Sequence, residues 1–222
     1  MGIFFVKFQE TTDGICYSND SIVVFFGKKN CDLNQLQKLF PTFQFRGVKQ
    51  THSNHFIQSV PDSGSIEADA HWTTEKNTAL LIKTADCLPI MVFEESSRKI
   101  AAIHAGWRGV AGRITPQILN TFSLIDLFIG PHILQKSFEV KEDAKALLAA
   151  SVSNLDSKNY IDLSSQQIKI DLEKIVVHQI GHHRIKNTYS LGIDTKTTPD
   201  FHSYRRDQQD AGRNLSFICL LT

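Results

Sequence analysis

The chain has 222 residues with 24 basic and 23 acidic side chains, which gives a net charge of +1. This length suits one domain spanning residues 1–222, which buries enough surface to fold without a disulfide or a structural metal. The balanced charge excludes a general attraction to nucleic acid or an anionic membrane, and no apolar run is long enough to predict a membrane span.

The first half of the chain predicts four β-strands, each a short apolar run bounded by turn residues, at residues 22–26, 79–82, 88–93 and 99–104. The first strand closes at Gly27, and the last leads into a turn-rich segment at residues 105–109. We expect a helix over residues 110–121, which Pro116 would kink or restart.

The second half predicts a strand over residues 124–129, stopped by a Gly-Pro pair, and a final strand over residues 215–221. Between them we expect two helices. The helix over residues 140–152 has helical spacing of its apolar face, which comprises Val140, Ala144, Leu147 and Leu148. The helix over residues 172–180 ends at Gly181. Without a regular βαβ rhythm, this order favours an α+β or mixed-sheet fold over a doubly wound parallel sheet.

The four cysteines are scattered along the chain without a Cys-x-x-Cys pair. This spacing argues against a zinc knuckle or a redox dithiol. Residues 1–7 also lack the pattern of a secretory signal. We therefore expect a cytoplasmic protein with reduced thiols.

Three side chains with metal-binding or nucleophilic chemistry lie where a strand gives way to a turn: His52, Cys87 and His104. A strand end has a rigid element behind it and open space ahead, which suits a ligand or a catalyst. A single buried cysteine can equally act as a small hydrophobe, and a single histidine can be an ordinary hydrogen-bonded residue. The separations of 35 and 17 residues match no compact zinc finger, so the residues alone leave the metal open.

Two segments, Thr-Ala-Asp-Cys-Leu-Pro-Ile at residues 84–90 and Ile-His-Ala-Gly-Trp-Arg-Gly at residues 103–109, resemble the core signature of the YfiH family. This family is also called the laccase-domain or polyphenol-oxidase-like family. Residues 49–52 resemble its Gln-Val-His-Gly element, and residues 68–70 resemble its Ala-Asp-Ala segment. Further similar blocks lie at residues 129–131, 201–207 and 212–213. The resemblance thus runs from about residue 49 to the C-terminus.

The resemblance implies an α+β fold, a single domain with four layers in the order α/β/β/α. It also implies a catalytic metal site made by His52, Cys87 and His104. Members of the family are associated with purine nucleoside phosphorylase activity, including methylthioadenosine as substrate, and with adenosine deaminase activity. The expected partners are therefore small-molecule purine nucleosides and phosphate. An older label for the family is copper polyphenol oxidase.

Two imidazoles and one thiolate give zinc three protein ligands and leave a fourth position open, which is the arrangement of catalytic zinc sites. Three arginines near the motifs, Arg108, Arg205 and Arg206, suit a planar grip on a phosphate group, and Arg108 is also a candidate catalytic residue. Each arginine has an alternative role in an ion pair with a carboxylate such as Asp207 or Asp210. For Trp107 we expect packing rather than stacking on substrate.

Two positions depart from the family pattern. His132 stands where relatives commonly carry a cysteine after Ile-Gly-Pro, and Asp194-Thr195 stands where they often show Cys-Thr. We expect both positions to line the site and to affect substrate range or rate. Neither changes the three expected ligands.

Three other functions use the same residues. A copper oxidase would need several His-x-His pairs, which this sequence lacks, although a thiolate with imidazoles accepts copper. A metal-independent cysteine hydrolase or amidase would use Cys87 as nucleophile and His104 as base. A non-catalytic binding module would use the metal for stability alone. The sequence assigns neither the general acid or base, for which Asp69 and Glu67 are nearest, nor the oligomeric state.

Overall fold

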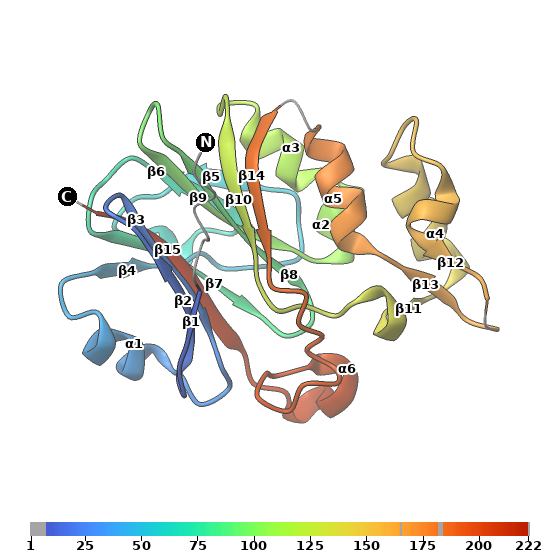
Figure 1. Ribbon diagram of the computed structural model, residues 1–222, viewed down its shortest axis with the longest axis horizontal. Coiled ribbons are helices and arrows are strands. Elements are labelled where there is room, and N and C mark those ends of the chain that lie inside the picture. Colours follow the sequence, from blue (N-terminus) through green and yellow to red (C-terminus); the bar gives the residue numbers. More distant parts are fainter. Residues whose placement is uncertain (1–7, 165, 182–183, 222) are drawn as a thin grey trace, which may run out of the picture.

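Two six-stranded β-sheets pack face to face in the computed structural model, which describes residues 8–164, 166–181 and 184–221 (Figure 1). Residues 1–7, which we compared with a secretory signal, lie outside the described residues. The strands of the first sheet are, in spatial order, β1 (Gln9–Glu10), β2 (Gly14–Ser18), β3 (Ile22–Gly27), β15 (Asn214–Leu220), β7 (Thr78–Thr84) and β4 (Gln44–Arg46). Those of the second are β14 (Ile185–Ser190), β10 (Ile125–Ile129), β8 (Leu88–Glu94), β9 (Lys99–Ala105), β6 (Ala70–Thr73) and β5 (Phe56–Gln58).

Both sheets are mixed. Neighbouring strands run antiparallel, except that β4 pairs parallel with β7, β5 with β6, and β10 with β14. A small third sheet has the order β11 (Glu139–Val140), β13 (Ile168–Ile170) and β12 (Ile161–Asp162), and lies at the edge of the molecule beside α4 (Figure 1). Within the described residues, no helix is both long and apolar enough to cross a membrane.

Helices cover the outer faces of the two large sheets. The helices are α1 (Leu33–Leu39), α2 (Trp107–Ala111), α3 (Ile114–Leu119), α4 (Glu142–Ala150), α5 (Leu172–Ile180) and α6 (Tyr204–Asp207). Leu36 of α1 packs on the first sheet against Phe25 and Phe217. Val110 and Ile175, from α2 and α5, pack on the second sheet. Between the sheets lies a separate apolar core. The expected α/β/β/α order of layers is therefore confirmed.

The strand predictions at residues 22–26, 88–93, 99–104, 124–129 and 215–221 are confirmed to within one residue at each end, as β3, β8, β9, β10 and β15. The strand expected at residues 79–82 is longer and spans Thr78–Thr84. The helix expected at residues 172–180 is confirmed as α5. Its N-cap is Asp171, and Gly181 follows it with a φ of 84°.

The single helix expected over residues 110–121 is wrong, because the chain forms α2 and α3 with a break between them. The break lies at Gly112 and Arg113, and Arg113 has a left-handed backbone with a φ of 59°. Pro116 lies in the first turn of α3. There its missing N–H would have no partner within the helix, so the proline fits the start of α3, and the restart that Pro116 was expected to cause is confirmed, two residues before the proline.

The prediction for residues 140–152 is wrong at both ends and on one face. Val140 belongs to strand β11, where it pairs with Ile168, and the helix begins only after Lys141. Ala144 and Leu148 are buried as expected, but the Leu147 side chain is 55% exposed. The helix-like spacing of apolar residues continues from β11 into α4, and periodicity alone does not reveal where the strand ends and the helix begins.

His71, on β6, is fully buried. Neither of its ring nitrogens has a well-aligned hydrogen-bond partner within the described residues. Burial lowers the pKa of His71 to about 3, and the nearby backbone of Leu81 offsets this only in part. The side chain is therefore neutral in the folded protein throughout the range in which a solvated histidine takes up a proton.

We predict that His71 makes the fold sensitive to acid. An unfolded histidine has a pKa of about 6.5, so between that pH and about 3 the unfolded chain binds a proton that the folded chain does not. Lowering the pH from 7 to 5 should cost about 2 kcal/mol of unfolding free energy through this residue. His71→Leu should remove that part of the pH dependence in denaturant titrations. Equal loss of stability in both proteins would contradict the prediction.

Candidate metal centre

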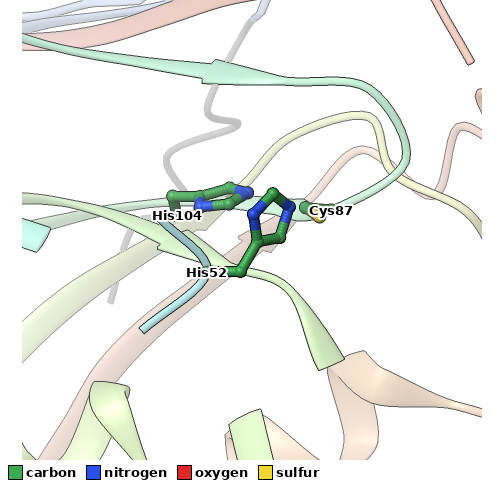
Figure 2. A group of neighbouring side chains, drawn as sticks. All are labelled: His52, Cys87 and His104. Atoms are coloured by element: carbon green, nitrogen blue, oxygen red, sulfur yellow. The ribbon is translucent and has the colours of Figure 1, made fainter. Parts of the chain in front are cut away.

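Three side chains from distant segments converge at one end of the two sheets. His52 lies in the connection from β4 to β5, Cys87 in the turn from β7 to β8, and His104 near the end of β9. Their potential ligand atoms all lie within 4.8 Å of one another. The imidazole rings of His52 and His104 have centroids 4.9 Å apart and lie nearly perpendicular, with Cys87 beside them (Figure 2).

The register of β8 and β9 explains the position of Cys87. Leu88 pairs with Ala105 and Pro89 with His104, so the turn residue Cys87 comes opposite Gly106. A Cβ atom at Gly106 would lie 3.0 Å from the Cys87 sulfur and 3.2 Å from the His52 ring. The glycine in the His-Ala-Gly-Trp-Arg-Gly segment therefore leaves the space that the three side chains occupy.

A buried carboxylate, Asp69, joins the segment of His52 to the strand of His104. Its Oδ1 atom lies 2.7 Å from His104 Nδ1 and accepts the backbone N–H of His52 at 3.0 Å. Its Oδ2 atom accepts the backbone N–H groups of Thr51 and Ser53 and the Ser53 hydroxyl. These bonds hold His52 in a left-handed backbone conformation, with a φ of 60°.

The same contact decides which nitrogen of His104 faces the cluster. Burial raises the pKa of the Asp69 carboxyl, but its bonds to His104 and Ser53 outweigh burial and hold the pKa well below its usual range. An ionised carboxylate only accepts hydrogen bonds, so His104 Nδ1 is the donor. Nε2 is then the nitrogen left for a metal or a substrate. Asp69 is fully buried and orients His104, so it is a poor candidate for general acid or base.

The electrostatics of the cluster favour a thiolate. Burial would raise the pKa of the Cys87 thiol, but hydrogen bonding to His104 and His52 lowers it to about 6. Burial would lower the pKa of His104, but its bonds to Asp69 and Cys87 raise it to about 9. Thiolate is the form of cysteine that binds metals and attacks electrophiles. The donor set of two imidazoles and one thiolate fits a transition metal, and it also fits a cysteine nucleophile beside a histidine.

The cluster opens into a cavity of about 740 Å³. Trp107, Ile133 and Phe138 supply apolar parts of its wall, and Tyr204 stands at it with an exposed side chain. Trp107 packs against the core of the second sheet and also lines the cavity. The guanidinium carbon of Arg108 lies over the Trp107 ring, 4.5 Å from the ring centroid. The sequence did not single out these wall residues: Ile133 and Phe138 lie in no motif, and Tyr204 lies in the block at residues 201–207, where the neighbouring arginines were the candidates.

The three expected phosphate-binding arginines lie in different environments. Arg108 and Arg205 line the cavity, and Arg205 also donates to the Glu139 carbonyl at 3.0 Å. Arg206 does not line it. Its guanidinium pairs with Asp207 at 2.7 Å and donates to backbone carbonyls that include those of Thr195 and Phe201. Arg206 therefore has the alternative role that the sequence allowed, an ion pair with Asp207, and it is not part of the proposed substrate site.

The two departures from the family pattern lie next to each other but behind the site. His132 and Asp194 form an isolated β-bridge, both are buried, and neither lines the cavity. The expectation that they line the site is therefore wrong, because both side chains are buried against other partners: Asp194 accepts a hydrogen bond from the Ser137 hydroxyl, and His132 Nδ1 lies 2.9 Å from the Gly130 carbonyl. The neighbouring Thr195 does reach the site, since its hydroxyl donates to the Asp86 carboxylate at 2.7 Å.

Comparison with known proteins places this geometry in a family. Residues 28–221 match the model of a family described as multi-copper polyphenol oxidoreductase laccase. A purine nucleoside phosphorylase from Clostridium acetobutylicum is 32% identical over 201 residues, which cover 85% of this chain and 82% of the relative. A purine nucleoside phosphorylase from Haemophilus influenzae is 34% identical over 186 residues, covering 77% and 72%.

Solved structures share the fold. The hypothetical protein YfiH of Bacillus licheniformis superposes with a TM-score of 0.86 at 19% identity, over 97% of this chain and 99% of that one. YlmD from Geobacillus stearothermophilus gives a TM-score of 0.84 at 20% identity, with the same coverage. At these identities the likeness concerns the fold alone.

We predict that Asp69→Asn weakens metal binding by roughly 10- to 100-fold, the usual effect of losing a carboxylate that orients a metal-bound histidine. The measurement is competition for zinc against a chromophoric chelator. Glu94→Gln is the matched control, because Glu94 is also buried and accepts hydrogen bonds from Ser97 and Ser123, at the far end of β8. Equal zinc affinity in the Asp69 variant and the wild type would show that Asp69 does not act on the site.

Proposed function

The chain belongs to the multi-copper polyphenol oxidoreductase laccase family, which is the YfiH family of the sequence resemblance, and on this premise we propose that it is a zinc-dependent purine nucleoside phosphorylase. The proposed substrates are a purine nucleoside and inorganic phosphate. The observation that carries the proposal is the three-donor cluster at the base of a cavity lined by cations. Relatives named purine nucleoside phosphorylase support the choice of reaction.

Phosphorolysis breaks the bond between ribose C1′ and N9 of the purine and joins C1′ to a phosphate oxygen. The base leaves with the electron pair of the broken bond and takes up a proton. Held by His52, Cys87 and His104, a zinc ion would supply a Lewis acid with one position open to substrate. Positioning and charge stabilisation are the main contributions that a protein makes to such a displacement.

The cavity wall supplies these contributions. Arg108 and Arg205 bring guanidinium groups to it, and a guanidinium binds phosphate oxygens in pairs. The rings of Trp107 and Phe138 offer apolar surface on which a purine can lie. Asp86, the carboxylate in the wall, accepts from the Thr195 hydroxyl and from the Arg205 backbone N–H, so its charge is partly compensated. We propose Arg108 as the catalytic cation, because its guanidinium lies over Trp107 at the cavity.

Methylthioadenosine phosphorolysis and adenosine deamination are further activities that we propose for the same site. Phosphorolysis of methylthioadenosine differs from that of adenosine only in the 5′ substituent of the ribose. Deamination replaces the amino group at C6 of adenine by oxygen from water and needs no phosphate. The requirement for phosphate therefore separates the two reactions.

Two alternatives make different use of the cluster. Copper suits a thiolate with two imidazoles, but a laccase needs further copper ligands. Within the described ranges, His52, Cys87 and His104 are the one group of three such side chains close enough for a shared ion. A cysteine hydrolase would use the Cys87 thiolate directly.

We also propose a cytoplasmic location, where the four free cysteines stay reduced.

We predict that zinc-loaded protein releases hypoxanthine from inosine only when phosphate is present. Cys87→Ala should lower this rate by more than about 100-fold, because it removes a metal ligand itself and not a residue that only orients one. Base release is followed by chromatography, and inosine formed from adenosine without phosphate reports deamination. Cys16→Ala, which removes another half-buried thiol, is the control. No turnover of any purine nucleoside would refute the proposal, and full activity after metal removal would favour the cysteine nucleophile.

A further inference from the structure

The cavity is strongly basic although the whole chain is nearly neutral. Its wall contains five cationic side chains, Lys49, Lys83, Arg108, Arg205 and Arg213, whereas the chain carries a net charge of only +1. Lys49 is paired with Glu67 at 2.8 Å. Arg205 donates to the Glu139 carbonyl, and its own backbone N–H contacts Asp86. Besides Arg108, the remaining cations are Lys83, in β7 of the first sheet, and Arg213, directly before β15 of the same sheet.

Lys83 lies in β7, and Arg213 lies in the segment directly before β15. Lys83 pairs with Leu215, and the pairing of the two strands ends at Asn214 opposite Thr84, so Arg213 is the first residue beyond the paired part of β15. Both side chains are exposed and both line the cavity. Two like charges in one cavity wall repel each other, and an anion between them would relieve that repulsion.

Hydrogen bonds hold the backbone of Lys83 and the guanidinium of Arg213. The Gln50 side chain bonds both the N–H and the carbonyl of Lys83, at 2.8 Å each, which fixes its backbone. One guanidinium nitrogen of Arg213 donates to the carbonyls of Ala211 and Gly212, both at 2.8 Å. Within the parts of the chain that the structure describes, neither cation forms an ion pair with a carboxylate.

We infer that Lys83 and Arg213 form a phosphate-group subsite in the wall of the metal cavity, separate from Arg108. An arginine fork and a lysine point charge in the same cavity wall suit the oxygens of one phosphate. The group is either inorganic phosphate or a phosphate monoester on a nucleotide. The inference rests on the proposed function for the rest of the ligand, but the subsite itself depends only on this pair.

The test is calorimetric binding to the metal-loaded protein, with inorganic phosphate, adenosine and adenosine 5′-monophosphate as separate probes. Lys83→Gln and Arg213→Gln are each compared with Lys38→Gln, which removes an exposed charge from α1, outside the cavity. If the subsite takes a monoester, the nucleotide binds at least about 10-fold more tightly than adenosine, and each subsite variant removes this preference. If it takes inorganic phosphate, the same variants weaken phosphate binding by that factor.

Unchanged binding of both phosphate-bearing probes in the two subsite variants would overturn the inference, as would an equal effect of Lys38→Gln. Thermal unfolding of each variant checks the fold, and Lys83→Gln alone decides if Arg213→Gln does not fold. Because binding is measured without turnover, a failure of the phosphate subsite can be distinguished from a failure of the proposed phosphorylase activity. Variant-sensitive phosphate binding in a protein that cleaves no nucleoside would retain the subsite and reject the phosphorylase.

Discussion

The contact between the Asp69 carboxylate and His104 is the constraint on which the site depends. Asp69 is fully buried, and such a carboxylate is costly to desolvate unless hydrogen bonds satisfy its oxygens. Here the imidazole of His104 and the backbone of residues 51–53 satisfy them. A single side chain therefore fixes the ring orientation of one proposed ligand and the strained backbone of another. The segment of His52 is attached to its surroundings also by the Asp69 backbone N–H, which donates to the His55 carbonyl, and by the Asn54 side chain, which donates to the Gly112 carbonyl.

The site also depends on how the chain passes between the sheets. Cys87 lies in the turn where β7 of the first sheet leads into β8 of the second. The cavity in front of it thus takes its walls from both sheets and from the helices that cover the second one. Lys83 comes from the first sheet and Arg213 from the segment directly before its strand β15, whereas Trp107 and Arg108 come from α2. The wall of the cavity thus combines cations and an aromatic ring from segments far apart in the sequence.

The sequence predicted the parts of the fold that are locally encoded. Long apolar runs marked the central strands, but β1, β4, β5 and β11–β13 have only two or three residues each, too few for any periodicity. The metal-site residues were recognisable from a motif, whereas the role of Asp69 arises from contacts across 35 residues of sequence. The sequence singled out Arg206 as a phosphate-binding candidate and not Arg213, but in the structure Arg206 pairs with Asp207 and Arg213 lines the cavity. Tertiary contacts of this kind leave no local pattern to read.

X-ray absorption spectroscopy of protein purified without added metal shows which atoms surround the ion at this site. We expect about one zinc per chain, bound by one sulfur at about 2.3 Å and two imidazole nitrogens at about 2.0–2.1 Å, with an oxygen or nitrogen ligand in the fourth position. The sulfur contribution should vanish in Cys87→Ser. A protein without stoichiometric metal, or a metal whose surroundings contain no sulfur, would rule out a metal centre made by His52, Cys87 and His104.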